Sequence, residues 1–332
     1  MAKLLEVNNV YRYYLHKKPI VLDGKKYSKY TIKAVDDVSF SLEEGEILGV
    51  IGESGCGKST LGRLLVNLEK PDKGQVLLKG VDANELLKKD RLAYHRSSQI
   101  IFQNPYDTFD PRHTIRKVLM SALKLHKIGK DDEERTQICI NALNEAGLIP
   151  AEDYLDRFPF ELSGGQLQRI SIMRCMLLDP VFLVADEPIS MLDVSIRADI
   201  IKMLQDLTKK YNTALVFISH DIATTRYISN KVAVMYLGRI VEYGDTDSIL
   251  HTPSHPYTQA LISNCASLDP LEKRDVIKLE GEPPVPINTG PGCYFAPRCQ
   301  YATERCFKEY PEFRTKKSGV QVSCFRVEEG EE

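Results

Sequence analysis

The chain contains the sequence Gly52-Glu53-Ser54-Gly55-Cys56-Gly57-Lys58-Ser59, and this stretch decides its fold. It matches the pattern G-x-x-x-x-G-K-[ST] of the P-loop, a glycine-rich loop that points its backbone N–H groups at phosphate. Lys58 supplies a positive charge for the outer phosphates, and the Ser59 hydroxyl is placed to coordinate Mg²⁺. The residues expected to contact a nucleotide here are Gly52, Ser54, Gly55, Cys56, Gly57, Lys58, Ser59 and Thr60.

The surroundings of this loop predict a strand, a turn and a helix in that order. An apolar run at residues 47–51 leads into the loop, and residues 60–68 have a helical pattern. Two more apolar runs, at 181–185 and 214–218, flank a predicted helix at 195–211. Buried strands that alternate with helices are typical of a parallel α/β sheet with helices on its faces.

Residues 104–165 have a different character. Charge rises, and the amphipathic runs 114–125 and 133–146 predict helices, the second of which Gly147 would end. This region finishes in a second short sequence, Leu162-Ser163-Gly164-Gly165-Gln166. Ser163 is a good N-cap for a following helix, and the free N–H groups of a helix start attract phosphate.

Several polar residues follow the predicted strands. Asp186 and Glu187 come directly after the run 181–185, and His220 follows the run 214–218. In open α/β sheets the carboxyl ends of the strands open into the crevice where ligands bind. We therefore expect these side chains to meet the phosphates.

The P-loop and the Ser-Gly-Gly-Gln sequence together resemble those of the ABC-transporter ATPase family. The resemblance covers residues 4–250 and implies a P-loop NTPase cassette at residues 1–250, with a RecA-like mixed sheet core, a small antiparallel β region and a helical subdomain at about 104–165. It also implies that each ATP is held between the P-loop of one cassette and the signature of another. The signature residues are Ser163, Gly164, Gly165 and Gln166.

The same resemblance assigns roles to single residues. Asp186 is similar to the Mg²⁺-anchoring acid and Glu187 to the catalytic glutamate that orients the attacking water. His220 resembles the switch histidine, and Gln103 the lid glutamine that reaches both Mg²⁺ and the water. The expected Mg²⁺ ligands are Ser59, Gln103 and Asp186.

Two further positions carry weaker signals. Asp193 ends Ser190-Met191-Leu192-Asp193, which resembles the loop that passes signals between cassettes, with Met191 in place of a small residue. Tyr14 falls where the family places an aromatic ring against adenine. Tyr11 and Tyr13 are alternatives to it.

Composition limits the other functions. The 332 residues carry a formal net charge of −2, so the chain lacks the excess of basic residues that is typical of nucleic-acid-binding proteins. No signal peptide opens the chain, and no apolar run approaches the length that spans a bilayer. We expect a protein of the cytoplasmic face of the membrane, with other chains supplying the transport path.

Four of the 8 cysteines gather near the end, at Cys293, Cys299, Cys306 and Cys324. In a reducing compartment such a cluster indicates metal ligation more than disulfides. The spacing is not that of a zinc ribbon, and four thiolates can hold zinc or a [4Fe–4S] cluster. Free thiols are a third option.

The sequence around these cysteines resembles the C-terminal extension of dipeptide/oligopeptide importer ATPases. That resemblance implies a second region at residues 251–332 and favours a [4Fe–4S] cluster at the four cysteines. We expect the cluster to stabilise this region, because the proline-rich segment otherwise lacks a core.

We therefore expect the ATP-hydrolysing subunit, of the F type, of an ABC importer for di- or oligopeptides. Its expected partners are a sister ATPase subunit, two membrane permease subunits and, through them, a solute-binding protein. A nickel or other small-solute importer is the alternative, followed by a soluble non-transport ABC ATPase and by a redox-sensing module built on the cysteines. The solute, and whether the two cassettes are identical, stay open.

Overall fold

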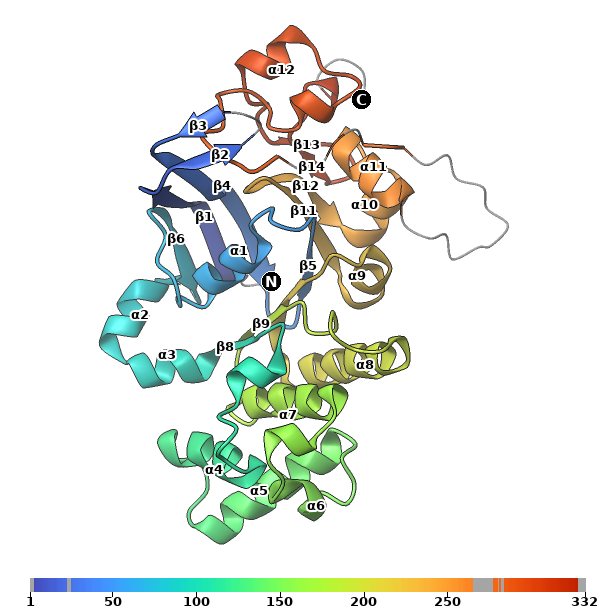
Figure 1. Cartoon of the computed structure of the whole chain (residues 1–332). Helices are drawn as coiled ribbons and strands as arrows, with labels where there is room; N and C mark the ends of the chain where they lie inside the picture. Colours follow the sequence, from blue (N-terminus) through green and yellow to red (C-terminus); the bar gives the residue numbers. More distant parts are fainter. Residues whose placement is uncertain (1–2, 23–24, 265–276, 280, 282–283, 328–332) are drawn as a thin grey trace.

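The computed structural model describes residues 3–22, 25–264, 277–279, 281 and 284–327 (Figure 1). Within them, an eight-stranded sheet has the order β13-β14-β12-β11-β5-β10-β9-β8. Its parallel part consists of β5 (Ile47–Ile51), β8 (Ser98–Ile101), β9 (Phe182–Asp186), β10 (Ala214–Ile218) and β11 (Lys231–Tyr236). Its antiparallel edge consists of β12 (Arg239–Asp245), β13 (Arg314–Thr315) and β14 (Gln321–Val322). The predicted mixed sheet is confirmed.

The parallel strands are buried on both faces, as their continuous apolar sequences predict. Along β9, Leu183 and Ala185 join one core, while Phe182 and Val184 join another on the opposite face. The first core lies under α8 (Val194–Tyr211) and the helical region, and the second lies under α1 (Lys58–Leu65) and a second sheet.

This second sheet is antiparallel and has the order β4-β1-β6-β7. Its strands are β1 (Lys3–His16), β4 (Tyr30–Glu43), β6 (Lys73–Leu78) and β7 (Val81–Asp82). A hairpin, β2 (Ile20–Leu22) and β3 (Lys25–Tyr27), joins β1 to β4. This hairpin is short, because β1 and β4 continue pairing to His16 and Tyr30.

The helical region forms one end of the molecule in Figure 1. Its elements are η1 (Pro105–Thr108), α4 (Ile115–Leu125), α5 (Asp132–Glu145), α6 (Glu152–Leu155), η2 (Pro159–Glu161) and α7 (Gly164–Met176). Thr114 and Asp131 cap α4 and α5 by accepting hydrogen bonds from the backbone N–H groups of Lys117 and Glu134. Helices α2 (Ala83–Lys89) and α3 (Arg91–Ser97) lead to β8, and α9 (Ile222–Ile228) lies beside β5.

The chain ends at the opposite end of the molecule (Figure 1). The elements there are α10 (Thr246–His251), α11 (Pro256–Ser263), η3 (Ala296–Arg298), α12 (Glu304–Lys308), β13 and β14. Residues 265–276 and 328–332 of the predicted extension lie outside the described residues.

The expectation that this segment lacks a core is wrong. Tyr257, Phe295 and Val322 of the extension are buried in one cluster with Val234 and Val241 of β11 and β12. The extension therefore adds to the apolar cover of the cassette sheet. No helix among the described residues is long and apolar enough to cross a bilayer.

Candidate functional site

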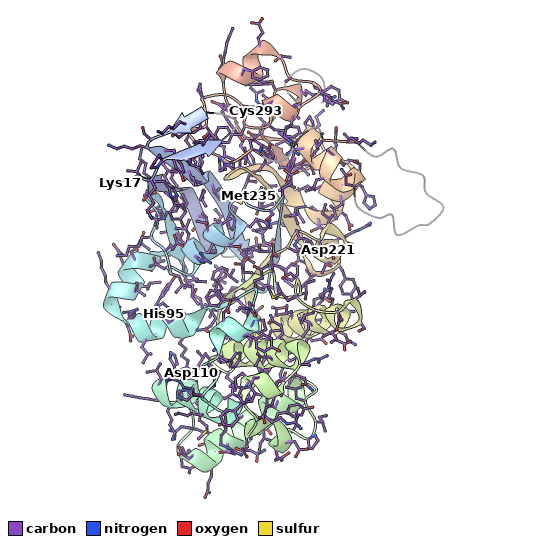
Figure 2. The ribbon with its side chains drawn as sticks, viewed as in Figure 1. Lys17, His95, Asp110, Asp221, Met235 and Cys293 are labelled. Carbon is purple, nitrogen blue, oxygen red and sulfur yellow. The ribbon has the colours of Figure 1, made fainter. Side chains whose placement is uncertain are left out.

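The P-loop connects β5 to α1, as the sequence predicted, and two of its glycines have no room for a side chain. A Cβ at Gly52 would lie 2.1 Å from the carbonyl oxygen of Met235. A Cβ at Gly57, where φ is 106°, would lie 1.9 Å from the carbonyl oxygen of Ala34. The loop is therefore pressed between β4 and β11, which fixes its backbone for an anion. Figure 2 labels Met235 beneath the extension.

Lys58 lies inside the loop. Its Nζ donates hydrogen bonds to the carbonyl oxygens of Gly52 at 2.8 Å and Glu53 at 3.0 Å. Only 5% of the residue is exposed, so the ammonium is held at the start of the loop and not in solvent. A buried amine with three donors is suited to phosphate oxygens at the same place.

Ser59 and Asp186 come from different elements and meet at the end of the sheet. The Ser59 hydroxyl donates to Asp186 Oδ1 at 2.9 Å. Burial raises the pKa of Asp186, and the hydrogen bond from Ser59 opposes that rise. A hydroxyl and a buried carboxylate in contact form a hard oxygen donor pair of the kind that Mg²⁺ prefers. These two residues fit a Mg²⁺ ion, which would neutralise charge on the phosphates of a bound nucleotide.

Glu187 lies where Gln103 and His220 converge. The Gln103 side-chain amide donates to Glu187 Oε2 at 3.0 Å, and His220 Nδ1 lies 3.4 Å from the same oxygen. Glu187 has φ = 47°, an unfavourable conformation for a residue with a Cβ, and such strain clusters at functional sites. The three side chains can together orient a water molecule against a terminal phosphate. Their individual roles stay predictions.

The tyrosines of β1 face different partners. Tyr14 donates from its hydroxyl to Glu69 at 2.5 Å, and Arg12 lies 4.8 Å from the centre of its ring. Tyr13 donates to Asp36 instead, and burial raises its pKa. No contact here decides which ring would stack on adenine, so the choice of Tyr14 over Tyr11 and Tyr13 stays a prediction.

The signature begins α7, as predicted. Ser163 Oγ accepts from the Gln166 N–H at 3.3 Å, and Gln166 Oε1 accepts from the Ser163 N–H at 2.9 Å, which is a complete capping box. A Cβ at Gly165 would lie 2.9 Å from a methyl carbon of Ile196, so a glycine is needed for the close packing of α7 on α8. In Figure 1, α7 lies in the lower half of the molecule and α1 in the upper half.

The signal loop lies next to the signature. Asp193 precedes α8 but makes no side-chain cap to it. Met191 and Val194 are apolar and exposed, by 62% and 80%. An exposed apolar pair beside the signature suits a surface that another protein covers.

The four terminal cysteines line a single cavity of about 250 Å³. All four are free thiols, and burial raises the pKa of Cys293 to about 11. Figure 2 labels Cys293 in the extension, at the end of the molecule opposite Asp110. Among the described residues, however, no three His, Cys, Asp or Glu side chains are arranged to hold a metal ion, so the predicted metal centre is not shown.

Sequence reasoning missed two residues of the extension that reach the P-loop. Arg298 forms an ion pair with Glu53, and the Tyr257 hydroxyl accepts from the Glu53 N–H. More than 200 residues separate each pair, and nothing in the local sequence of Arg298 or Tyr257 points to the P-loop.

Comparison with known proteins decides the family. Residues 35–190 match the family model described as ABC transporter, and residues 241–306 match the oligopeptide/dipeptide transporter C-terminal region. The dipeptide transport ATP-binding protein DppF of Haemophilus influenzae is 42% identical over 98% of this chain and 97% of that protein. The chain belongs to the family of ATP-binding proteins of peptide ABC transporters.

Other relatives of this ABC ATPase agree. DppF of Escherichia coli is 43% identical over 90% of the chain and 89% of that protein, and the oligopeptide transport ATP-binding protein AppF of Bacillus subtilis is 40% identical over 97% and 96%. The dimeric structure of MJ0796, a bacterial ABC transporter cassette, has a TM-score of 0.61 and 26% identity and covers 73% of this chain and 98% of that one. The ABC cassette fold is thereby confirmed. None of these comparisons supports the iron–sulfur prediction.

Proposed function

We propose that this ABC ATPase hydrolyses ATP to power the import of di- or oligopeptides. The observation that carries the proposal is the similarity to dipeptide and oligopeptide transport proteins over nearly the full chain, including the C-terminal region. An importer for nickel or another small solute is the alternative, because a cassette does not itself touch the solute. We keep the division of the chain near residue 250 as part of this proposal.

In the proposed mechanism the P-loop of one cassette and the signature of a second enclose each ATP. Lys58 contacts the outer phosphates, and Ser59, Asp186 and Gln103 would hold Mg²⁺. Glu187 holds the attacking water in line, with Gln103 and His220 fixing its carboxylate. The capped start of α7 supplies free N–H groups to the partner's nucleotide.

The proposed partners follow from this half-site arrangement. A sister ATPase subunit would cover the exposed Met191 and Val194, and two permease subunits would contact the helical region near Gln103. A solute-binding protein would deliver peptide from the other side of the membrane. The chain would then be a peripheral protein of the cytoplasmic face.

We also propose that the cysteine cavity holds a [4Fe–4S] cluster, with zinc as the alternative. Support comes from the four thiols around one cavity, whose lining includes the cationic Arg305 and Arg326. Metal and sulfide analysis of anaerobically purified protein tests this. Iron and sulfide in equal amounts, with visible absorbance, are expected, whereas colourless protein with one zinc per chain contradicts the cluster.

Uptake of a labelled dipeptide tests the main proposal. Vesicles are reconstituted with the permease subunits, the binding protein and wild-type cassettes. They should transport the peptide only when ATP is supplied on the side of the membrane that carries the cassettes. The same vesicles with the Glu187→Gln chain should not. Transport of nickel but not of peptide would favour the alternative.

A further inference from the structure

Two residues of the extension, Arg298 and Tyr257, bind Glu53 of the P-loop. Arg298 Nη1 donates to Glu53 Oε2 at 2.8 Å and Arg298 Nη2 donates to Glu53 Oε1 at 3.1 Å. The Tyr257 hydroxyl accepts from the Glu53 N–H at 2.9 Å. The side chain and the backbone of Glu53 are therefore both fixed by residues that follow the cassette in sequence.

This contact is well shielded from solvent. The Arg298 side chain is 7% exposed and that of Glu53 is 21% exposed, while Tyr257 is fully buried. Two parallel, charge-assisted hydrogen bonds are among the strongest polar contacts in proteins, and partial burial reduces their screening. Arg298 also donates to the hydroxyl of Tyr236 at 3.4 Å and to the carbonyl oxygen of Gly281 at 3.2 Å, which restricts its guanidinium further.

Glu53 connects this contact to the phosphate-binding lysine. Its carbonyl oxygen accepts from Lys58 Nζ, while its carboxylate binds Arg298. Without Arg298, a carboxylate would stand unpaired in the loop that receives the polyphosphate of ATP. Like charges in a partly buried site repel strongly, so Arg298 removes a local penalty on ATP binding as well as fixing the loop.

We propose that Arg298 is a positioning residue of the nucleotide site, which holds and neutralises Glu53 so that the P-loop is ready for phosphate. The proposal makes the C-terminal extension part of the ATP site of its own chain. It rests on ATP binding at the P-loop and not on the identity of the imported solute.

The arrangement also links the ATP site to the cysteine cavity. Phe295 lines that cavity and packs against Tyr257 with ring centres 5.5 Å apart, and Cys299 follows Arg298 directly. Coupling between two sites is reciprocal, so ATP binding should stabilise the segment around Arg298.

The first test measures MgATP affinity by calorimetry in the full chain as purified, in a Glu187→Gln background so that ATP is not consumed. Arg298→Met should weaken binding about tenfold or more, as expected for loss of a charge-assisted contact. Arg298→Lys should restore part of the affinity. Adding Glu53→Gln to Arg298→Met should also restore affinity, because it removes the unpaired carboxylate.

The matched control is Tyr294→Phe. The Tyr294 hydroxyl joins the extension to Lys33 at 2.9 Å and to Asp36 at 2.5 Å, but it does not touch the P-loop. Tyr257→Phe should weaken MgATP binding, and Tyr294→Phe should leave it unchanged. In chains that retain Glu187, Arg298→Met should raise KM for ATP with little change in kcat, as removal of binding alone does.

A second readout is amide hydrogen exchange at residues 292–299. MgATP should slow exchange there in the Glu187→Gln chain, and the effect should vanish with Arg298→Met. Unchanged affinity in Arg298→Met, or failure of Glu53→Gln to restore it, would overturn the inference while leaving the ATPase assignment intact. A chain with native Arg298 that binds no ATP would overturn that assignment itself.

Discussion

The nucleotide-binding edge of the sheet and the cysteine cavity of the extension are assembled in different ways. At the sheet edge, Asp186 ends β9, Glu187 follows β9 and His220 follows β10, and the parallel pairing of β9 with β10 brings them to one edge. Around the cavity, the four cysteines come from turns and short elements with no regular pairing between them. The residues of a site at strand ends can therefore be predicted from local sequence, whereas the cavity depends on tertiary packing.

The two regions also differ in what stabilises them. The strands under the nucleotide edge are completely buried in the cassette core. The extension is tied on by β14 pairing with β12, and by Asp36, which accepts hydrogen bonds from Tyr294 of the extension and Arg239 of β12. If this contrast holds, substitutions at the sheet edge should mainly lower the rate of ATP hydrolysis. Substitutions where the extension joins the cassette should mainly lower the free energy of unfolding.

Glu187→Gln carries the largest expected effect. The amide keeps the shape of the side chain but cannot accept a proton or polarise water, so kcat should fall by about 10²–10⁴-fold. Binding of MgATP should be retained. ATPase assays on the chain assembled with its partner cassette measure kcat, and calorimetry measures the affinity for MgATP.

Glu145→Gln is the control for this change, since Glu145 pairs with Lys210 and ends α5, which lies at the opposite end of the molecule from the C-terminal extension and away from α1 (Figure 1). It should hydrolyse ATP at the wild-type rate. Normal turnover by the Glu187→Gln chain would break the assignment of the catalytic glutamate.

Asp36→Asn tests the joint between cassette and extension. The variant leaves Arg239 without its carboxylate partner, and removing one member of a buried pair costs about 3–5 kcal/mol of unfolding free energy. Urea unfolding at neutral pH measures the loss. Asp156→Asn, which removes the exposed pair of Asp156 with Arg116, should cost less than about 1 kcal/mol.

The effect of Asp36→Asn should depend on pH. Burial tends to raise the pKa of Asp36, but hydrogen bonds from Tyr13 and Tyr294 and the charge of Arg239 outweigh it and lower the pKa below its ordinary 3.8. A lowered pKa stabilises the fold above the unfolded-state value, and that stabilisation is lost as the pH falls through the folded-state value. The difference between wild type and variant should therefore shrink below about pH 4. A constant difference would contradict the role of the charge.

Val322→Ala sharpens the same contrast by packing alone. Val322 is fully buried in β14, so truncation should lower the unfolding free energy by about 1–3 kcal/mol. Val285→Ala is the control, since Val285 is 51% exposed. Equal stability of the two variants would show that the extension does not share the core of the cassette.

Ser163→Ala should lower the unfolding free energy by only about 1 kcal/mol, through loss of the helix cap. Thr114→Ala removes the equivalent cap from α4 and should cost a similar amount. Only Ser163→Ala should also slow ATP hydrolysis in the assembled pair of cassettes. If both variants hydrolyse ATP at the wild-type rate, the signature does not complete a partner's site.

Much of the sheet and of the nucleotide site was predictable because its signals are local. The run at 47–51 with its P-loop, the carboxylates after 185 and the capping pattern at Ser163 each specify an element and its end. Helix α4 starts one residue after the predicted run 114–125 begins, because Thr114 is its N-cap. The long pairing of β1 with β4 joins distant segments and has no comparable local signal.

The sequence by itself determined the P-loop, the signature and the family, because each depends on a few adjacent residues whose backbone conformation is nearly fixed by their chemistry. Only the tertiary structure decided that Glu187, Gln103 and His220 share one oxygen, and that Arg298 and Tyr257 reach Glu53. Those contacts join segments far apart in the chain, and their geometry is set by the packing of whole sheets and cores. The extension likewise became part of the cassette through a shared core that no single segment of the chain contains.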